Sequence, residues 1–284
     1  KLIEPYESVV ETYSLPKYSE LDPTGVIAIF YTIFTGFMIG DLGYGLLGVI
    51  GILLGLKLKE FPKKTEQTMR LFLRISLSAC VFGIIFGSFF GGIVDVPFGW
   101  IDITTDINQL IRLSIIIGGI SLFFALGIKG FMAIRDGHPD ALFFDVISWY
   151  MAVGGAIVLI ITKSPIAKWV MIVGMALIVL FAGRAAKSWG ARIASGTYEL
   201  YGITSWIGDF VSFLRLMALV LSGGFVAYSV NLIVNMMVGS GIGGLIGGII
   251  VFIVFQLFNM FLSYLSAYVH LSLIHISEPT SPER

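Results

Sequence analysis

TGVIAIFYTIFTGFMIGDLGYGLLGVIGILLGL occupies residues 24–56 and decides how the chain is organised. As one helix this stretch would be about 50 Å long, whereas the hydrocarbon core of a bilayer is about 30 Å thick. Three glycines and Asp41 fall together within it, in GDLGYG at 40–45. The stretch therefore predicts a break at this point and two short membrane spans, at about 24–39 and 43–57.

Long apolar runs continue through the rest of the chain, which is 57% hydrophobic and 13% charged. A soluble domain is about 45–50% apolar and about 25% charged. Runs of about 20 apolar residues are long enough to cross a bilayer. The chain is therefore predicted to be an all-α polytopic membrane bundle of about eight transmembrane helices, the last two long and tilted. The further spans are predicted at about 70–94, 107–134, 140–162, 165–186, 197–237 and 241–271.

The charges between the predicted spans indicate their orientation. In an eight-span topology the loops 57–70, 129–140 and 184–196 lie on the side of the N-terminus, and they are rich in Lys and Arg. A loop on the opposite side carries Asp95, Asp102 and Asp106. The positive-inside rule then places both termini in the cytoplasm. The net charge is zero, so nothing favours a nucleic-acid partner.

Glycines recur four residues apart within the apolar runs, for example at Gly83, Gly87 and Gly91. Small residues at this spacing let transmembrane helices approach each other closely. We interpret these glycines as packing positions in a helix bundle.

A second feature is the apolar run GDFVSFLRLMALVLSGG at 208–224, which has Arg215 in its middle. A guanidinium keeps its charge, and a charge at the centre of a bilayer costs about 2.5–3.5 kcal/mol on insertion scales. A carboxylate partner or a water-filled cavity must compensate for it. Steps of three and four residues place small or polar residues on the face of Arg215, namely Ser205, Gly208, Ser212 and Ser222. The alternative is a structural ion pair between two helices of this chain.

Two acidic residues of the same predicted helix are weaker candidates as partners. Asp209 lies about 120° around the helix from Arg215, and Glu199 lies nearly opposite. We therefore expect the anion that compensates Arg215 to come from another helix or from another chain.

The last predicted span carries a polar stripe, because its polar residues are spaced by 3, 4, 3 and 4 positions. A lone polar residue in a span often links two helices, but five in register favour the wall of a wet pathway. A polar face packed against the preceding helix is the alternative. The residues of this stripe are Gln256, Asn259, Ser263, Ser266 and His270.

Three further polar residues, Asp41, Asp145 and His270, lie in or near the predicted spans. His270 could relay protons, since the pKa of histidine is near neutrality, or could be an ordinary hydrogen-bonded histidine. Asp41 is expected at a hairpin where it faces water, and Asp145 near the headgroups, so a structural role is favoured for both. No nucleotide loop, metal-binding cluster or hydrolytic triad is recognisable. No metal, cofactor or enzyme chemistry within this chain is therefore expected.

Three motifs resemble the membrane half of the stator subunit of A-type and V-type rotary ATPases, called subunit a or subunit I. The resemblance covers about residues 20–270. It is carried by PTGVIAIFYTIFTGFMIGDLGYGLLG at 23–48, FGIIFGSFFGG at 82–92 and SWIGDFVSFLRLMALVLSGG at 205–224. The FLRLMAL segment is the most specific of these, because few families place an arginine within such a run.

The resemblance implies an ion-translocating stator that is not itself catalytic. In that family the last two helices lie against a rotating ring of proteolipid subunits, and an arginine matching Arg215 meets a carboxylate of each ring subunit in turn. The resemblance therefore implies that the small-residue face of Arg215 and the polar stripe from Gln256 to His270 both face outward toward a ring rather than into the bundle. Such a cation favours the ionised carboxylate, and two half-channels bring a proton or sodium ion to and from the ring. The family also implies a peripheral stalk as a partner, and a location in the cell membrane of an archaeon or bacterium.

The two ends of the chain depart from the family pattern. The family places a second arginine in the last span, whereas Leu273 stands at the matching position. Residues 272–284 resemble translated adapter sequence and are interpreted as a non-native tail. Residues 1–23 are interpreted as the remnant of a cytoplasmic N-terminal domain, and 24–271 as the membrane domain.

Two other functions remain open from the residues alone. A secondary transporter would have its own central binding site, often within inverted repeats and broken helices. A structural membrane scaffold would tolerate an apolar residue at position 215. Both alternatives share the helical bundle with the stator.

Overall fold

A computed structural model describes residues 24–94, 97, 99–135, 137, 142–181, 189–239 and 241–274 of the chain. These residues form helices joined by turns and contain no strand, which confirms the all-α prediction. The described helices are α2 (Thr24–Ile39), α3 (Leu42–Leu58), α4 (Lys63–Ile85), α5 (Ile107–Arg135), η1 (Leu142–Ile147), α7 (Ser148–Thr162), α8 (Pro165–Phe181), α9 (Trp189–Val238) and α10 (Ile242–Ile274).

Among the described residues, four helices are long and apolar enough to cross a membrane, namely Lys63–Ile85, Ile107–Arg135, Ile193–Val238 and Ile242–Val269. Four shorter apolar helices complete the set: Ala28–Ile39, Leu42–Leu58, Ser148–Thr162 and Pro165–Phe181. Each predicted span thus corresponds to a helix. A multi-pass membrane protein follows, while the count of eight crossings stays a prediction.

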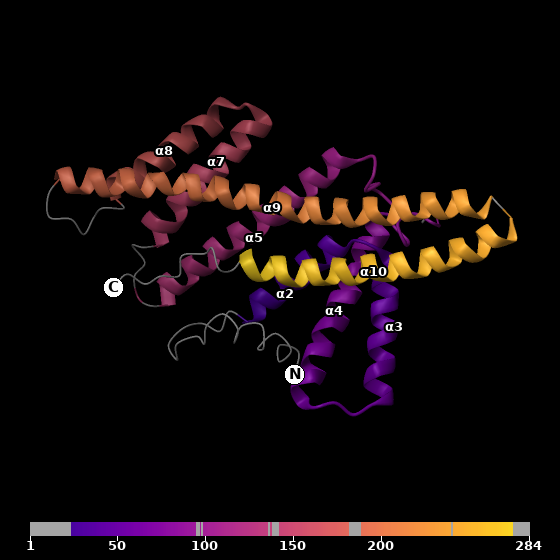
Figure 1. The fold of residues 1–284 in the computed structure, drawn as a ribbon. Coiled ribbons are helices and arrows are strands. Elements are labelled where there is room, and N and C mark those ends of the chain that lie inside the picture. The colour runs from indigo at the N-terminus through magenta and orange to yellow at the C-terminus, as the bar shows by residue number, and fades with distance from the viewer. Residues whose placement is uncertain are drawn as a thin grey trace. The chain divides into compact units, whose positions relative to one another are not determined.

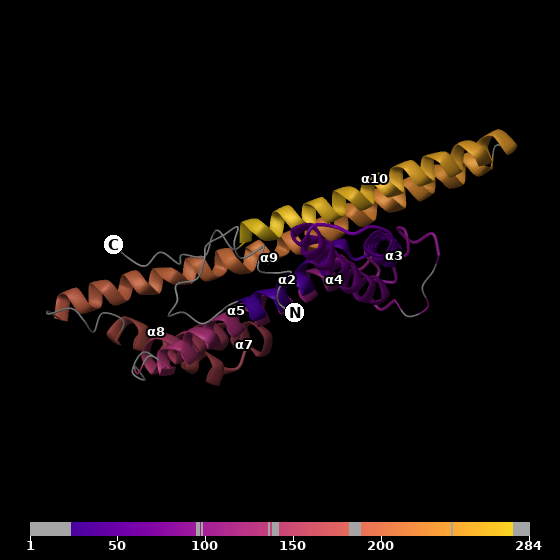
Figure 2. The same ribbon diagram turned by 90° about the horizontal axis from the view of Figure 1, so that it is seen from below.

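The chain divides into two compact units. Residues 1–114 and 214–284 make up the first unit, and residues 115–213 the second. Helices α5 and α9 each continue from one unit into the other. Figure 1 and Figure 2 show that α10 runs beside the second half of α9.

The break between α2 and α3 lies where the sequence predicted it. Helix α2 ends at Ile39, and Gly40 adopts a left-handed conformation with φ of +51°. Asp41 is extended and caps α3, because its carboxylate accepts a hydrogen bond from the backbone N–H of Tyr44. An acidic N-cap satisfies an N–H group that has no partner inside the helix.

Helix α4 differs from its predicted bounds at both ends. It begins at Lys63, directly after Pro62. Its polar first turns, which contain the ion pair between Glu66 and Arg70, extend the helix on the N-terminal side of the apolar part. It ends at Ile85 rather than near residue 94. Gly87 and Gly91 both have positive φ and lie in the turn that follows, so the predicted helical spacing of the three glycines is wrong.

Gly83 remains a packing position inside α4. A Cβ atom at Gly83 would lie 2.1 Å from the backbone nitrogen of Leu42. The backbones of α4 and of the α2–α3 break therefore approach each other as closely as only glycine permits.

In the first unit, the core gathers apolar side chains of α2, α4 and the second half of α9. The ring of Phe37 is fully buried and packs edge-on against Phe82 and Phe86. Leu216 and Val220 are buried on α9. One face of α9 is thereby committed to the interior of this unit.

The second unit packs α7 and α8 backbone to backbone. A Cβ atom at Gly174 of α8 would lie 2.5 Å from the backbone nitrogen of Ala152 of α7. The indole rings of Trp149 and Trp206 stack with centroids 5.8 Å apart, joining α7 to the first half of α9.

Candidate functional site

Arg215 lies near the middle of α9 and is half-buried. Helix α9 begins at Trp189, eight residues before the predicted start. At about 1.5 Å per residue its 50 residues span about 75 Å, far more than the roughly 30 Å of a bilayer core. The great length that was predicted for this helix is confirmed, while its tilt stays a prediction.

The predicted small-residue face of Arg215 is open for most of its length. Ser205, Gly208 and Ser222 are exposed, and Ser212 is half-buried. A Cβ atom at Gly208 would meet nothing within 4 Å. These residues leave room for another helix, and contact with a ring stays a prediction.

The polar stripe of α10 divides into two parts. Ser263 and Ser266 are half-buried, whereas Gln256 and Asn259 are buried, with 2% and 4% of their surfaces exposed. The expectation that the whole stripe faces outward is wrong for Gln256 and Asn259, because their amides find hydrogen-bond partners inside the unit. Their part in a half-channel stays a prediction.

Gln256 and Asn259 belong to a buried polar cluster with Tyr44 of α3 and Asn231 of α9. The hydroxyl of Tyr44 donates to Oε1 of Gln256 and accepts from Nδ2 of Asn259 at 2.8 Å. Nε2 of Gln256 donates to Oδ1 of Asn231 at 2.9 Å. Nδ2 of Asn259 also donates to the carbonyl of Gly223 at 2.9 Å. These bonds join α3, α9 and α10.

The cluster also holds the turn that follows α4. Nδ2 of Asn231 donates to the carbonyls of Phe90 at 2.6 Å and Gly91 at 3.1 Å. Phe90 has a φ of +48°, which is uncommon for a bulky residue. Its ring packs edge-on against Tyr44. The left-handed conformation of Phe90 is thus held by two contacts, the hydrogen bond from Asn231 to its carbonyl and the packing of its ring against Tyr44.

Asp41 contacts the other side of this turn. Its carboxylate accepts hydrogen bonds from Ser88 Oγ at 2.7 Å, Phe90 N at 3.1 Å and Gly91 N at 2.9 Å, besides that from Tyr44 N. Only 4% of Asp41 is exposed, so the expectation that it faces water is wrong. The surrounding N–H and O–H donors compensate for burial of the carboxylate.

A groove lies between α9 and α10, with a volume of about 430 Å³. Leu219, Ser222 and Gly223 line it from α9, and Asn259, Ser263 and Ser266 line it from α10. Phe255, Phe258 and Leu262 make much of its wall apolar. We call it the α9–α10 groove; it brings parts of both predicted stripes together.

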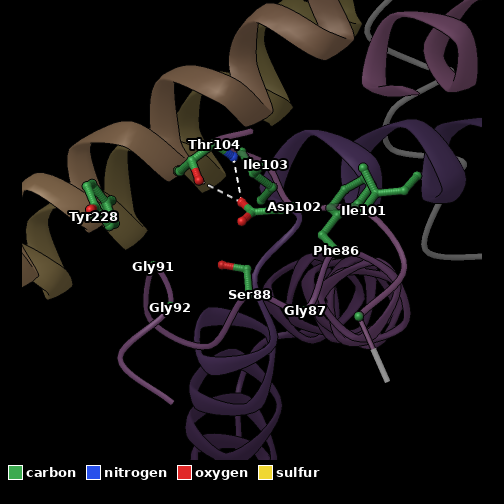
Figure 3. A pocket seen from close by; sticks show the side chains of 12 residues that line it. Phe86, Gly87, Ser88, Gly91, Gly92, Ile101, Asp102, Ile103, Thr104 and Tyr228 are labelled. Carbon is green, nitrogen blue, oxygen red and sulfur yellow. Dashed lines mark hydrogen bonds between the residues drawn. The ribbon is translucent and has the colours of Figure 1, made fainter. Parts of the chain in front are cut away.

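A second cavity of about 300 Å³ lies beside the loop that joins α4 to α5 (Figure 3). Ser88, Gly91 and Asp102 line it together with Gly224 and Tyr228 of α9. We call it the loop cavity. In Figure 3 the carboxylate of Asp102 accepts hydrogen bonds from N and Oγ1 of Thr104, at 2.8 and 2.7 Å.

The electrostatics of the loop cavity depend on Asp102. Partial burial raises the pKa of this carboxyl, but the hydrogen bonds from Thr104 and Thr105 together outweigh burial and hold the pKa below its usual value. Asp102 therefore carries its negative charge at neutral pH. Among the residues that the structure describes, no group of three or more His, Cys, Asp or Glu side chains could hold a metal ion.

The remaining candidates are not gathered at either cavity. Glu199 is exposed and Asp209 is half-buried, both on α9. The side chains of His270 and Asp145 lie outside the described residues. Sequence reasoning missed Tyr44, Asn231 and Ser88, although an amide at position 231 within a long apolar run was a signal for an interhelical contact.

Sequence comparison relates this chain to known proteins. No protein-family model matches the chain. Subunit I of the A-type ATP synthase of Thermococcus kodakarensis is 28% identical over 292 aligned positions, which cover 96% of this chain. The corresponding subunit of Pyrococcus horikoshii is 30% identical over 243 positions, or 81% of this chain. The chain is homologous to subunit I of A-type ATP synthases.

The chain is also similar to a subunit of a V-type ATP synthase. The V-type ATP synthase subunit I 2 of Treponema pallidum is 35% identical over 91 residues, 32% of this chain. This subunit I homologue spans less than half of the curated relatives that it matches, 43% of the Thermococcus protein and 36% of the Pyrococcus protein. The identities over most of this chain confirm the resemblance to subunit I that the three sequence motifs indicated.

Proposed function

We propose that this chain is the ion-translocating membrane part of the stator of an A-type or V-type rotary ATPase. The observation that carries the proposal is Arg215, a permanent charge at the middle of a 50-residue apolar helix, in a chain homologous to subunit I. Its partners are a ring of proteolipid subunits with buried carboxylates, and a peripheral stalk held by other parts of the subunit. Catalysis of ATP turnover belongs to other subunits of the complex.

In this proposal Arg215 attracts one ring carboxylate at a time and keeps it ionised, since a cation within about 4–6 Å favours the charged form. The ion leaves the carboxylate on one side of Arg215 and another binds on the other side. The permanent charge of the guanidinium opposes the direct passage of a cation between the two half-channels. The open small-residue face around Arg215 supports this role, because it lets a ring helix approach closely.

The α9–α10 groove is the proposed cytoplasmic half-channel. Ser222, Ser263 and Ser266 supply hydroxyls along it that can solvate an ion. The loop cavity, with the carboxylate of Asp102 beside it, is the proposed opening toward the outer side. A cation is attracted to this negative charge.

Replacing Arg215 tests the proposal in the complete rotary complex. Arg215→Ala and Arg215→Lys are both expected to abolish ATP-driven ion transport into liposomes, while the complex still assembles and hydrolyses ATP. The matched control is Arg70→Ala, because Arg70 is an exposed arginine that pairs with Glu66 on the surface of α4. Transport at the level of the unchanged complex in Arg215→Ala would refute the role of Arg215.

A further inference from the structure

The two cavities of the first unit lie on opposite sides of one segment of α9. Gly223 lines the α9–α10 groove, and its neighbour Gly224 lines the loop cavity. The same division holds one turn further on, where Val226 lines the groove and Tyr228 the loop cavity. Neither glycine contributes a side chain to the segment that separates the two cavities.

The buried polar cluster is hydrogen-bonded to residues that line each of the two cavities. Asn259 lines the groove and donates to the carbonyl of Gly223. On the other side, Asn231 donates to the carbonyl of Gly91, which lines the loop cavity. Gln256 bonds to Asn231 and also to the carbonyl of Ala227 at 3.3 Å, so the cluster follows α9 from one cavity to the other.

The side chains of the cluster are poorly suited to transferring protons. Its four members are neutral, and each of their side chains is hydrogen-bonded to another member. Proton relays within membranes are built from Asp, Glu and His, whereas a neutral amide has fixed donors and a fixed acceptor. Amides whose hydrogen bonds are all made within the protein therefore place polar groups between the two cavities. They do not provide a site that takes up and releases a proton.

We propose that Tyr44, Asn231, Gln256 and Asn259 form a permanent barrier that stops protons and water from crossing between the loop cavity and the α9–α10 groove. The barrier acts in addition to the charge of Arg215. It rests on one part of the proposed function, namely that the two cavities face opposite sides of a membrane. The strained turn at Phe90 supports the barrier, because its carbonyl is the acceptor for both Asn231 and Gln256.

Two substitutions test the barrier by passive proton flux through complete complexes in liposomes without nucleotide. Gln256→Glu keeps the shape of the side chain but introduces a group that can bind and release a proton, and we expect severalfold faster flux. Asn259→Ala removes the amide that closes the groove beside Gly223 and is also expected to raise the flux. The control is Asn235→Ala, since Asn235 is an exposed amide on the same helix α9.

Flux at the level of the unchanged complex in both assembled variants would overturn the barrier, as would an equal rise in Asn235→Ala. If neither variant assembles, hydroxyl-radical footprinting of the unchanged complex decides. Tyr228, which is exposed at the loop cavity, should be labelled, whereas Tyr44 should be protected. Equal labelling of the two tyrosines would contradict the barrier. None of these measurements needs ATP-driven transport, so they are separate from the test of Arg215.

Discussion

Asp41 illustrates at the scale of one residue why a carboxylate can be buried in a membrane protein. Its two oxygens accept four hydrogen bonds, from the backbone of α3, from Ser88 and from the turn at Phe90 and Gly91. The hairpin around Asp41 could be predicted from the glycines of GDLGYG. Its burial could not, because three of the four donors come from a turn about 50 positions further along the chain.

Asp41→Asn is expected to destabilise the protein. An asparagine has one acceptor oxygen, and its NH₂ group would point at a donor, so at least one buried N–H or O–H would lose its partner. Such a loss costs about 1–3 kcal/mol. Thermal unfolding of the detergent-solubilised complex measures the change. Glu60→Gln, at an exposed position, should have little effect; an equally small effect of Asp41→Asn would contradict the structural role.

At the scale of the element, α9 determines most of the proposed site. One face carries Leu216, Val220 and Ala227 into the core of the first unit, and another leaves Ser205, Gly208 and Ser222 exposed. The helical period predicted the small-residue face of α9, and three of its four small residues are exposed. For α10 the outward face was predicted wrongly at Gln256 and Asn259, because periodicity shows which residues share a face but not which neighbour covers that face.

Two glycines of neighbouring helices allow a matched test of helix packing. Gly83→Ala should destabilise the protein by about 1–3 kcal/mol, since the new Cβ would collide with the backbone of Leu42 and overpack the contact. Gly51→Ala should be neutral or stabilising by up to about 1 kcal/mol, because nothing lies within 4 Å and alanine favours a helix. Thermal unfolding compares the two, and a reversed order would refute the packing role of Gly83.

At the scale of the whole molecule, the chain combines two compact units, each with its own core, and two helices that run through both. The first unit contains Arg215, the buried cluster and both cavities. The second unit is held by the close α7–α8 contact and by stacked aromatic rings. Apart from Ser205, Gly208 and Ser212, which belong to the second unit, the positions in the proposed site thus lie in one unit.

The predicted orientation can be tested by labelling with a membrane-impermeant maleimide in intact cells. In a Cys80→Ala background, Trp100→Cys should be labelled from outside, since residue 100 is 82% exposed in the loop that follows α4. Lys59→Cys, exposed between α3 and α4, should be labelled only after the cells are opened. Labelling in the reverse pattern would place the termini outside, against the positive-inside prediction.

The sequence by itself determined the helical membrane class, the break at Gly40 and Asp41, the position of Arg215 within a long helix, and the homology to subunit I. These depend on composition, spacing and local turn chemistry, which are properties of neighbouring residues. Only the tertiary structure decided that Tyr44 bonds to Gln256 across 212 positions, and that Gly223 and Gly224 border two different cavities. A buried polar group bonds to whichever partner the packing of distant helices brings near, and no local pattern encodes that partner.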